Sequence, residues 1–214
     1  MRVGRRHARL PRIVTPSNKA AVGIVAVLLL VGLYLVTNAL PARLAATTLR
    51  PSAVDAWLPL YPPSVWIYCS YPALFVSAYV IEKDPLALTR FVYADVAANL
   101  VSHLVFLLWP TTFPRPELDP ASADPLSIWL LRTYWSIDAP LDCFPSLHVS
   151  TTILPVLMLI GRAPRLVAAY AAWAAAICVS TMTTKQHAAI DVAGGVLVAL
   201  ATWTVFFRVA RYAP

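Results

Sequence analysis

Residues 20–40 read AAVGIVAVLLLVGLYLVTNAL, an unbroken run in which no side chain carries a charge. About 20 consecutive apolar residues let a helix cross the hydrocarbon core of a bilayer, so this run predicts a membrane-spanning helix. A cleaved signal peptide is the alternative, but the run is long for a signal sequence and no small-x-small cleavage site follows it. We therefore expect a retained helix that ends before Pro41.

The composition of the whole chain also indicates a membrane protein. Of its 214 residues, 59% are apolar and 13% are charged, whereas soluble domains have about 45–50% and about 25%. The net charge is +7, but the cations do not cluster on a polar face as they do in nucleic-acid-binding domains. Six of them lie within the first 19 residues, directly before the first apolar run. We predict a polytopic membrane protein that does not bind nucleic acid.

Five further apolar stretches are recognised by their length and by the prolines and charges that bound them. The six predicted spans are Ala20–Leu40, Ser64–Ile81, Phe91–Trp109, Pro145–Ile160, Arg165–Met182 and Ala188–Phe207. They predict an all-α fold, with six transmembrane helices in a bundle that forms one membrane domain over residues 20–207. A basic cytoplasmic tail, residues 1–19, is expected before this domain, and a cytoplasmic tail, residues 208–214, after it.

The distribution of cations predicts which face of the domain is cytoplasmic. Six spans place both termini on one side, and if that side is inside, inner segments hold 12 of the 17 Lys and Arg residues and outer segments hold 5. Cytoplasmic segments of membrane proteins carry such an excess. The longest connection, residues 110–144, is then extracytoplasmic, and its segment Leu126–Trp135 is predicted to form a short amphipathic helix at the interface. We expect the protein in the cell membrane, with both termini in the cytoplasm.

Two ionisable residues at the start of the last predicted span, His187 and Asp191, are candidates for a functional site. Ionisable side chains in membrane spans are costly and usually serve a function. Residues four apart share a face of a helix, so the Asp191 carboxylate can accept a hydrogen bond from the imidazole and fix its tautomer. A purely structural polar contact between helices is the alternative for such a pair.

A second candidate site lies at the start of the fourth predicted span, in the sequence PSLH that ends at His148. Pro145 suits the first position of a helix, which leaves the backbone N–H groups near Ser146 and Leu147 free to bind an anion. The predicted topology brings His148 to the extracytoplasmic face, where His187 also lies.

Two cations, Arg115 and Lys185, are expected on the same face. Cations and helix N–H groups can hold phosphate oxygens and stabilise a charged transition state. One histidine can attack phosphorus while the other protonates the leaving oxygen, so the cluster suits phosphoryl transfer. Metal binding is an alternative, because His and Asp are also metal ligands, but two cations would repel a metal ion. A transporter whose polar residues line a pathway is the alternative from another class.

Asp95 and His103 are ionisable residues of the third predicted span. They are eight residues apart, about two helical turns, and can share a face. We retain both as candidate substrate contacts, although a hydrogen bond to Asn99 or Ser102 would also explain them.

The two histidine motifs resemble signatures of the type 2 phosphatidic acid phosphatase (PAP2) superfamily. Pro145-Ser-Leu-His148 is similar to the second signature, Pro-Ser-Gly-His. The third signature is Ser-Arg, five residues, His, three residues, Asp, and its spacing is reproduced from Ser180 to Asp191. Phe113-Pro-Arg115-Pro116 is similar to the end of the first signature, but Leu108 stands where that signature has a lysine.

The resemblance implies a six-helix membrane core with its active site on the extracytoplasmic face and no metal or cofactor. It implies that His187 is the nucleophile and forms a phosphohistidine, that Asp191 orients it, and that His148 is the general acid. The residues expected to bind phosphate are Arg115, Ser146, Leu147 and Lys185.

Departures from the signatures bear on the substrate. Thr181 replaces an arginine and Leu147 replaces a glycine, and we expect Lys185 to supply the missing charge. Ser180 is a candidate substrate contact. These motifs resemble the branch that includes inositol phosphorylceramide synthases and related lipid phosphotransferases, and fewer cations suit a phosphodiester. A phospholipid, sphingolipid or polyprenyl phosphate is the expected substrate, and either water or an alcohol can be the acceptor. The sequence leaves the oligomeric state open.

Overall fold

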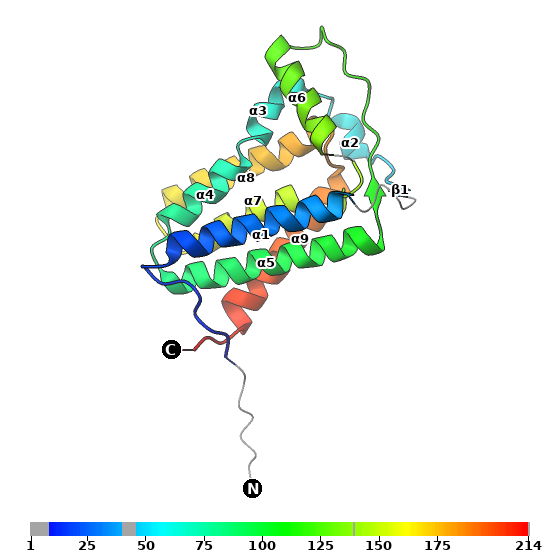
Figure 1. Cartoon of the computed structure of the whole chain (residues 1–214). Coiled ribbons are helices and arrows are strands. Elements are labelled where there is room, and N and C mark those ends of the chain that lie inside the picture. Colours follow the sequence, from blue (N-terminus) through cyan, green and yellow to red (C-terminus); the bar gives the residue numbers. More distant parts are fainter. Residues whose placement is uncertain (1–8, 40–45, 139, 214) are drawn as a thin grey trace.

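The computed structural model describes residues 9–39, 46–138 and 140–213, and these are mostly helical (Figure 1). The helices are α1 (Lys19–Ala39), α2 (Ala53–Trp57), α3 (Val65–Tyr68), α4 (Tyr71–Ile81), α5 (Pro85–Leu108), α6 (Pro125–Ile137), α7 (Leu147–Met158), α8 (Pro164–Thr183) and α9 (Ala189–Trp203). A 3-10 turn (Pro62–Ser64) precedes α3, and a π-helical turn (Thr204–Val209) extends α9. Two short strands, β1 (Thr47–Thr48) and β2 (Thr111–Thr112), pair in parallel.

Five stretches in the described part of the chain are helical, long and apolar enough to cross a membrane. They are Lys19–Asn38, Pro62–Ile81, Pro85–Leu108, Pro164–Thr183 and Ala189–Val209. Each corresponds to one of the predicted spans, and the prediction of a helical membrane protein is confirmed to this extent. The predicted end of the first span, Leu40, lies outside the described residues, as do residues 1–8 and 214 of the two predicted tails.

The fourth predicted span, Pro145–Ile160, is shorter than expected. It corresponds to α7, a helix of 12 residues, whereas a helix needs about 20 to cross a bilayer. Ser146 caps the helix N-terminus, and the chain turns at Gly161, whose φ is +94°. Because α7 packs against α4, α5, α8 and α9, much of its surface is covered by other helices.

The third predicted span, Phe91–Trp109, begins earlier than expected. Its helix, α5, starts at Pro85, and the Asp84 side chain caps it by accepting a backbone N–H. Proline is favoured in the first turn because it lacks an N–H that would have no acceptor there. Arg90, which marked the boundary in the sequence, lies within α5 with its guanidinium 5.5 Å from the centre of the Tyr212 ring.

Contacts between distant segments define one end of the helical array. Leu10 and Tyr212 form a parallel bridge, so the two described ends of the chain lie together. Lys19 Nζ donates to the Glu82 carbonyl at 2.8 Å, and Arg162 forms an ion pair with the Glu82 carboxylate. The described part of the predicted N-terminal tail is therefore packed against the protein. The opposite end holds α2, α6 and the β1–β2 pair (Figure 1).

Two adjacent glycines allow α7 and α9 to approach each other closely. A Cβ added at Gly195 would lie 2.5 Å from the Ser146 carbonyl and 2.8 Å from Val149 Cβ, and one at Gly194 would lie 2.6 Å from the Phe144 ring. Real Cβ atoms do not sit so close to neighbouring atoms. This approach brings the N-terminal turns of α7 and α9, which carry the two histidine motifs, side by side.

Candidate functional site

His187 lies in the turn between α8 and α9. The carbonyl of Thr181 accepts hydrogen bonds from the backbone N–H groups of Gln186 (3.0 Å) and His187 (3.1 Å). Lys185 adopts the left-handed conformation, with φ of 55°, so the chain reverses within this turn. Thr181, at the position of the signature arginine, is fully buried, and its hydroxyl donates to the Cys178 carbonyl. In this structure Thr181 therefore anchors the turn.

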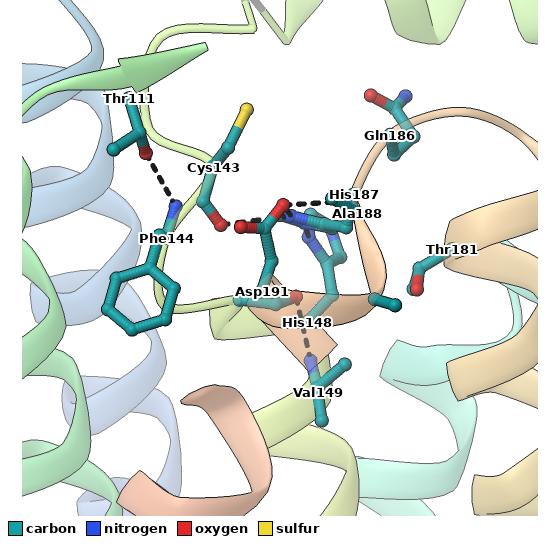
Figure 2. A network of polar contacts seen from close by, with 12 residues as sticks. Thr111, Cys143, Phe144, His148, Val149, Thr181, Gln186, His187, Ala188 and Asp191 are labelled. Atoms are coloured by element: carbon teal, nitrogen blue, oxygen red, sulfur yellow. Dashed lines mark hydrogen bonds and ion pairs between the residues drawn. The ribbon is translucent and has the colours of Figure 1, made fainter. Parts of the chain in front are cut away.

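Two hydrogen-bond acceptors face one nitrogen of the His187 ring (Figure 2). Nδ1 lies 3.1 Å from the carbonyl oxygen of Cys143 and 3.6 Å from Asp191 Oδ2. A carbonyl cannot donate, so Nδ1 carries the proton and, in the neutral ring, Nε2 carries the lone pair. Asp191 is fully buried, and its Oδ2 also accepts the backbone N–H of Ala188 at 2.7 Å. This arrangement leaves Nε2 as the nitrogen with the lone pair.

His148, in the first turn of α7, faces that atom. Its Nδ1 is 3.4 Å from His187 Nε2, and the two ring centres are 5.6 Å apart. Its Nε2 lies 2.7 Å from the hydroxyl of Tyr68 on α3. The structure therefore brings together all three predicted catalytic residues, His148, His187 and Asp191.

Ser146 joins the two histidine motifs through its backbone. Its N–H donates to the carbonyl of Asp191 at 3.0 Å, and its hydroxyl caps α7 by accepting the Val149 N–H at 3.3 Å. Both partners are buried with Ser146. The N–H groups of Leu147 and His148 belong to the first helical turn, which has no intrahelical acceptors for them. The predicted phosphate-binding turn therefore begins beside the two imidazoles.

Arg115 lies close to the site but is engaged by protein acceptors. Its guanidinium donates to the carbonyls of Trp135 (3.0 Å) and Asp138 (2.9 Å) and to Gln186 Oε1 (2.5 Å). It also lies over the Trp135 ring, 5.4 Å from its centre. Arg115 thereby ties the end of α6 to the residue that precedes His187.

Lys185 is also engaged by the protein. Its Nζ donates to the carbonyls of Leu58 at 2.6 Å and Asp55 at 3.1 Å, both on or next to α2. Burial lowers the pKa of this amine, and the nearby Asp55 carboxylate opposes that shift. In the structure the ammonium group anchors the turn that carries His187.

Three other predicted contact residues have no direct contact with His148 or His187 among the described interactions. The Ser180 hydroxyl donates to Ile177 within α8. His103 Nδ1 bonds the Asn99 carbonyl, and both are buried within α5. Asp95 lines a cavity of about 580 Å³ between α1, α4 and α5. Lys19 and Lys83 also line it, so this cavity lies at the end away from His187.

Two residues of the site, Tyr68 and Asp55, were missed by the sequence analysis. Tyr68 lies in a segment rich in aromatic residues, and nothing in its local pattern distinguishes it from the others. Asp55 could have been noticed, because Ser52-x-x-Asp55 is a helix-capping pattern and α2 indeed starts there. Its Oδ1 accepts the N–H of Ala189, the first residue of α9, at 2.7 Å.

The loop that leads into α7 is poorly solvated. Burial, together with the neighbouring Asp138, raises the pKa of Asp142 to about 7. Burial and the charge of Asp191 raise the pKa of the Cys143 thiol to about 12. A desolvated site strengthens electrostatic interactions with a charged substrate. Within the described residues, no three His, Cys, Asp or Glu side chains converge as metal ligands.

Comparison with known proteins gives one match. A family model described as the PAP2 superfamily matches residues 60–205, which include both histidine motifs, Arg115 and Tyr68. No curated protein and no solved structure matches the chain.

Proposed function

The chain belongs to the PAP2 superfamily, and from this premise we propose that it is a membrane lipid phosphatase or phosphotransferase that works through His187, His148 and Asp191. Membership itself indicates phosphatase or phosphotransferase chemistry. The observation that carries the proposal is the 3.4 Å contact between His187 Nε2 and His148 Nδ1, with acceptors alone on the other nitrogen of His187. A nucleophile and a proton donor are thus paired at one point.

The first chemical step uses the lone pair of His187 Nε2. This atom attacks phosphorus, and the bond from phosphorus to the leaving alkoxide oxygen breaks as the N–P bond forms. The leaving oxygen takes the proton from the His148 imidazolium Nδ1, and the Asp191 carboxylate stabilises the positive charge that develops on His187. Because the two nitrogens are in contact in this structure, the rings must separate to admit the phosphoryl group.

The second step resolves the phosphohistidine. His148 Nδ1, now neutral, takes a proton from water or from an alcohol, whose oxygen attacks phosphorus while the N–P bond breaks. Water gives hydrolysis, and an alcohol gives transfer to a new lipid or headgroup.

The phosphate oxygens would be held by the first turn of α7 and by nearby cations. The N–H groups of Leu147 and His148 and the hydroxyl of Ser146 lie at the helix N-terminus, which favours an anion. Arg115 would contact the phosphate by exchanging one of its present acceptors. Lys185 would have to leave the carbonyls on α2 to do the same.

We further propose that α7 completes a set of six crossings. The two described ends of the chain lie together, so the chain would cross the membrane an even number of times. Five helices are long enough to cross by themselves, and α7 would supply the sixth crossing. The excess of cations at that end supports placing it in the cytoplasm. The site would then act on lipids of the outer leaflet, with α6 lying at the interface.

The proposed substrate is a phospholipid, a sphingolipid or a polyprenyl phosphate. With Thr181 buried in a structural role, the third motif supplies one cation fewer than the family signature. This supports a phosphodiester and a phosphotransferase related to the inositol phosphorylceramide synthases.

Trapping of the intermediate tests the proposal. Purified protein is mixed with phosphatidate or phosphatidylinositol labelled at phosphorus, quenched, and assayed for protein-bound label that is stable in alkali and labile in acid. We expect label in the wild-type protein and none in His187→Ala, and we expect turnover to persist in EDTA. Full turnover by His187→Ala would contradict the nucleophile, and complete loss in EDTA, restored by one divalent ion, would indicate a metal site.

A further inference from the structure

Tyr68 is the second partner of His148. Its side chain is fully buried on α3, and its hydroxyl lies 2.7 Å from His148 Nε2. Its ring packs against that of Tyr134 on α6 in a T-shaped arrangement, with centres 5.3 Å apart and planes at 84°. A buried phenol has few alternatives for its hydroxyl, so the Tyr68 hydroxyl is fixed where His148 can meet it.

The partners of the two histidines differ in kind. His187 Nδ1 faces a carbonyl and a carboxylate, which only accept hydrogen bonds, so one tautomer is imposed. His148 Nε2 faces a hydroxyl, which both donates and accepts. It accepts a hydrogen bond from Nε2–H of the imidazolium, and again from Nε2–H of the neutral ring that remains when Nδ1 has given up its proton. Tyr68 can therefore hold His148 in both of the protonation states through which a general acid and base must pass.

A hydroxyl also differs from a carboxylate in charge. A carboxylate beside His148 would stabilise the imidazolium and oppose release of its proton, as a buried ion pair does. The neutral phenol fixes the orientation of the ring without this effect. It also occupies Nε2, so that Nδ1 is the atom turned towards His187.

We propose that Tyr68 is a positioning residue for His148, which keeps Nδ1 as the nitrogen that gives a proton to the leaving oxygen and takes one from the acceptor. This inference rests on the proposed function. Because Tyr68 lies on α3 and His148 on α7, catalysis would also depend on the packing of α3 against the site.

Tyr71 provides a matched control. Its ring also contacts His148, with centres 4.9 Å apart and planes at 82°. No hydrogen bond between its hydroxyl and His148 is found among the described contacts. Tyr71→Phe therefore removes the same atom from a neighbouring tyrosine while the link from Tyr68 to His148 remains.

The test compares two probes that differ in their leaving group. Phosphatidate has a poor alkoxide leaving group, which needs a proton, and p-nitrophenyl phosphate has an acidic one, which hardly needs it. We expect Tyr68→Phe to lower kcat for phosphatidate by about tenfold, the size of one hydrogen bond, with KM unchanged and a smaller loss for the nitrophenyl ester. Tyr71→Phe should stay within about twofold of wild type for both probes.

The outcomes separate the inference from the proposed function. His148→Ala, which removes the proposed general acid, should lose more kcat for phosphatidate than for the nitrophenyl ester. If it does, a wild-type kcat in Tyr68→Phe, or an equal loss for both probes, overturns the role of Tyr68. If His148→Ala lacks that difference between the probes, or if His187→Ala remains active, the proposed function fails and the role of Tyr68 fails with it.

Discussion

The carboxylate of Asp55 accepts a hydrogen bond from the backbone N–H of Ala189 at 2.7 Å, and so joins α2 to the first residue of α9. The carbonyls of Asp55 and Leu58 also accept the Lys185 ammonium group. α2 thus holds the chain on both sides of His187. This helix lies outside residues 60–205, the part that matches the family, so the nucleophile is anchored in part by a segment that the family model does not cover.

Removing the Asp55 carboxylate should weaken this anchor. Asp55→Ala leaves the N–H groups of Ala189 and Ser52 without their carboxylate acceptor, and we expect a loss of about 1–3 kcal/mol in unfolding free energy. For a chain of this size each kcal/mol lowers the melting temperature by about 2–4 °C. Thermal unfolding in detergent measures the effect. Glu117→Ala, at an exposed loop position, is the control, and equal melting temperatures for the two variants would contradict the anchor.

The role of Lys185 can be separated by Lys185→Met. If the ammonium group serves mainly to anchor the turn, as its bonds to α2 indicate, the variant should lose about 1 kcal/mol of stability while KM for phosphatidate changes by less than about threefold. If Lys185 binds phosphate, KM should rise by about tenfold or more, because a hydrogen bond to a charged group is worth about 1.5–3 kcal/mol. Steady-state kinetics and a melting curve on the same preparation decide between the two.

Asp191→Asn should leave the fold and remove most of the activity. The amide oxygen can still accept the Ala188 N–H, but the negative charge that stabilises the His187 imidazolium is lost. An analogous change in a serine protease costs about 10⁴-fold, so we expect kcat to fall by two to four decades, about 3–5 kcal/mol. The melting temperature serves as the control for folding. A loss of less than about fivefold in kcat would show that Asp191 is structural.

Stability should fall as the pH rises from about 4 to about 7. Burial raises the pKa of Asp142 to about 7 in the folded protein, whereas the unfolded chain titrates near 4. Between these values the folded state holds a proton that the unfolded state has lost. Stability therefore decreases with pH by at most about 1.4 kcal/mol per unit, and by less because Asp142 as a whole is only partly buried. Above about pH 7 this contribution is constant.

Asp142→Asn should remove the contribution of this carboxyl to the slope, because the amide does not titrate. We expect the variant to be more stable than wild type at pH 8 and similar to it at pH 4. Melting temperatures measured across this range test the prediction. Parallel curves for the two proteins would show that Asp142 is not the group responsible.

The orientation in the membrane can be tested with single cysteines in a background without Cys69, Cys143 and Cys178. Ser122 lies in the exposed loop before α6, and Ala163 is exposed at the opposite end, where it precedes α8. The nearby Gly161 is not used, because its positive φ disfavours a side chain. An impermeant maleimide should label Ser122→Cys in intact cells and Ala163→Cys only after lysis. Labelling of Ala163→Cys alone would invert the proposed topology.

Much of this protein is determined by local features of its sequence. Two local features were enough to locate five long helices: runs of about 20 apolar residues, the length that crosses a bilayer, and the prolines at their ends. They were enough because backbone groups in lipid must find their hydrogen-bond partners within the same helix. The spacing of His187 and Asp191 predicted that they lie close together, but as residues on one face of a helix. In the structure His187 precedes α9, and the turn before that helix brings its ring to 3.6 Å from Asp191. The boundary at Phe91 was wrong because Arg90 is accommodated by aromatic contacts that lie far away in the chain.

Only the tertiary structure decided which distant groups meet. The close approach of α7 and α9 at Gly195 sets the 3.4 Å contact between His148 and His187, and the packing of α3 sets Tyr68 against His148. Likewise, Lys185 is bound by carbonyls of α2 rather than left free. A sequence specifies residue types and the periodicity of single helices, but these pairings depend on how side chains of separate helices fill the space between them, and no local pattern carries that information.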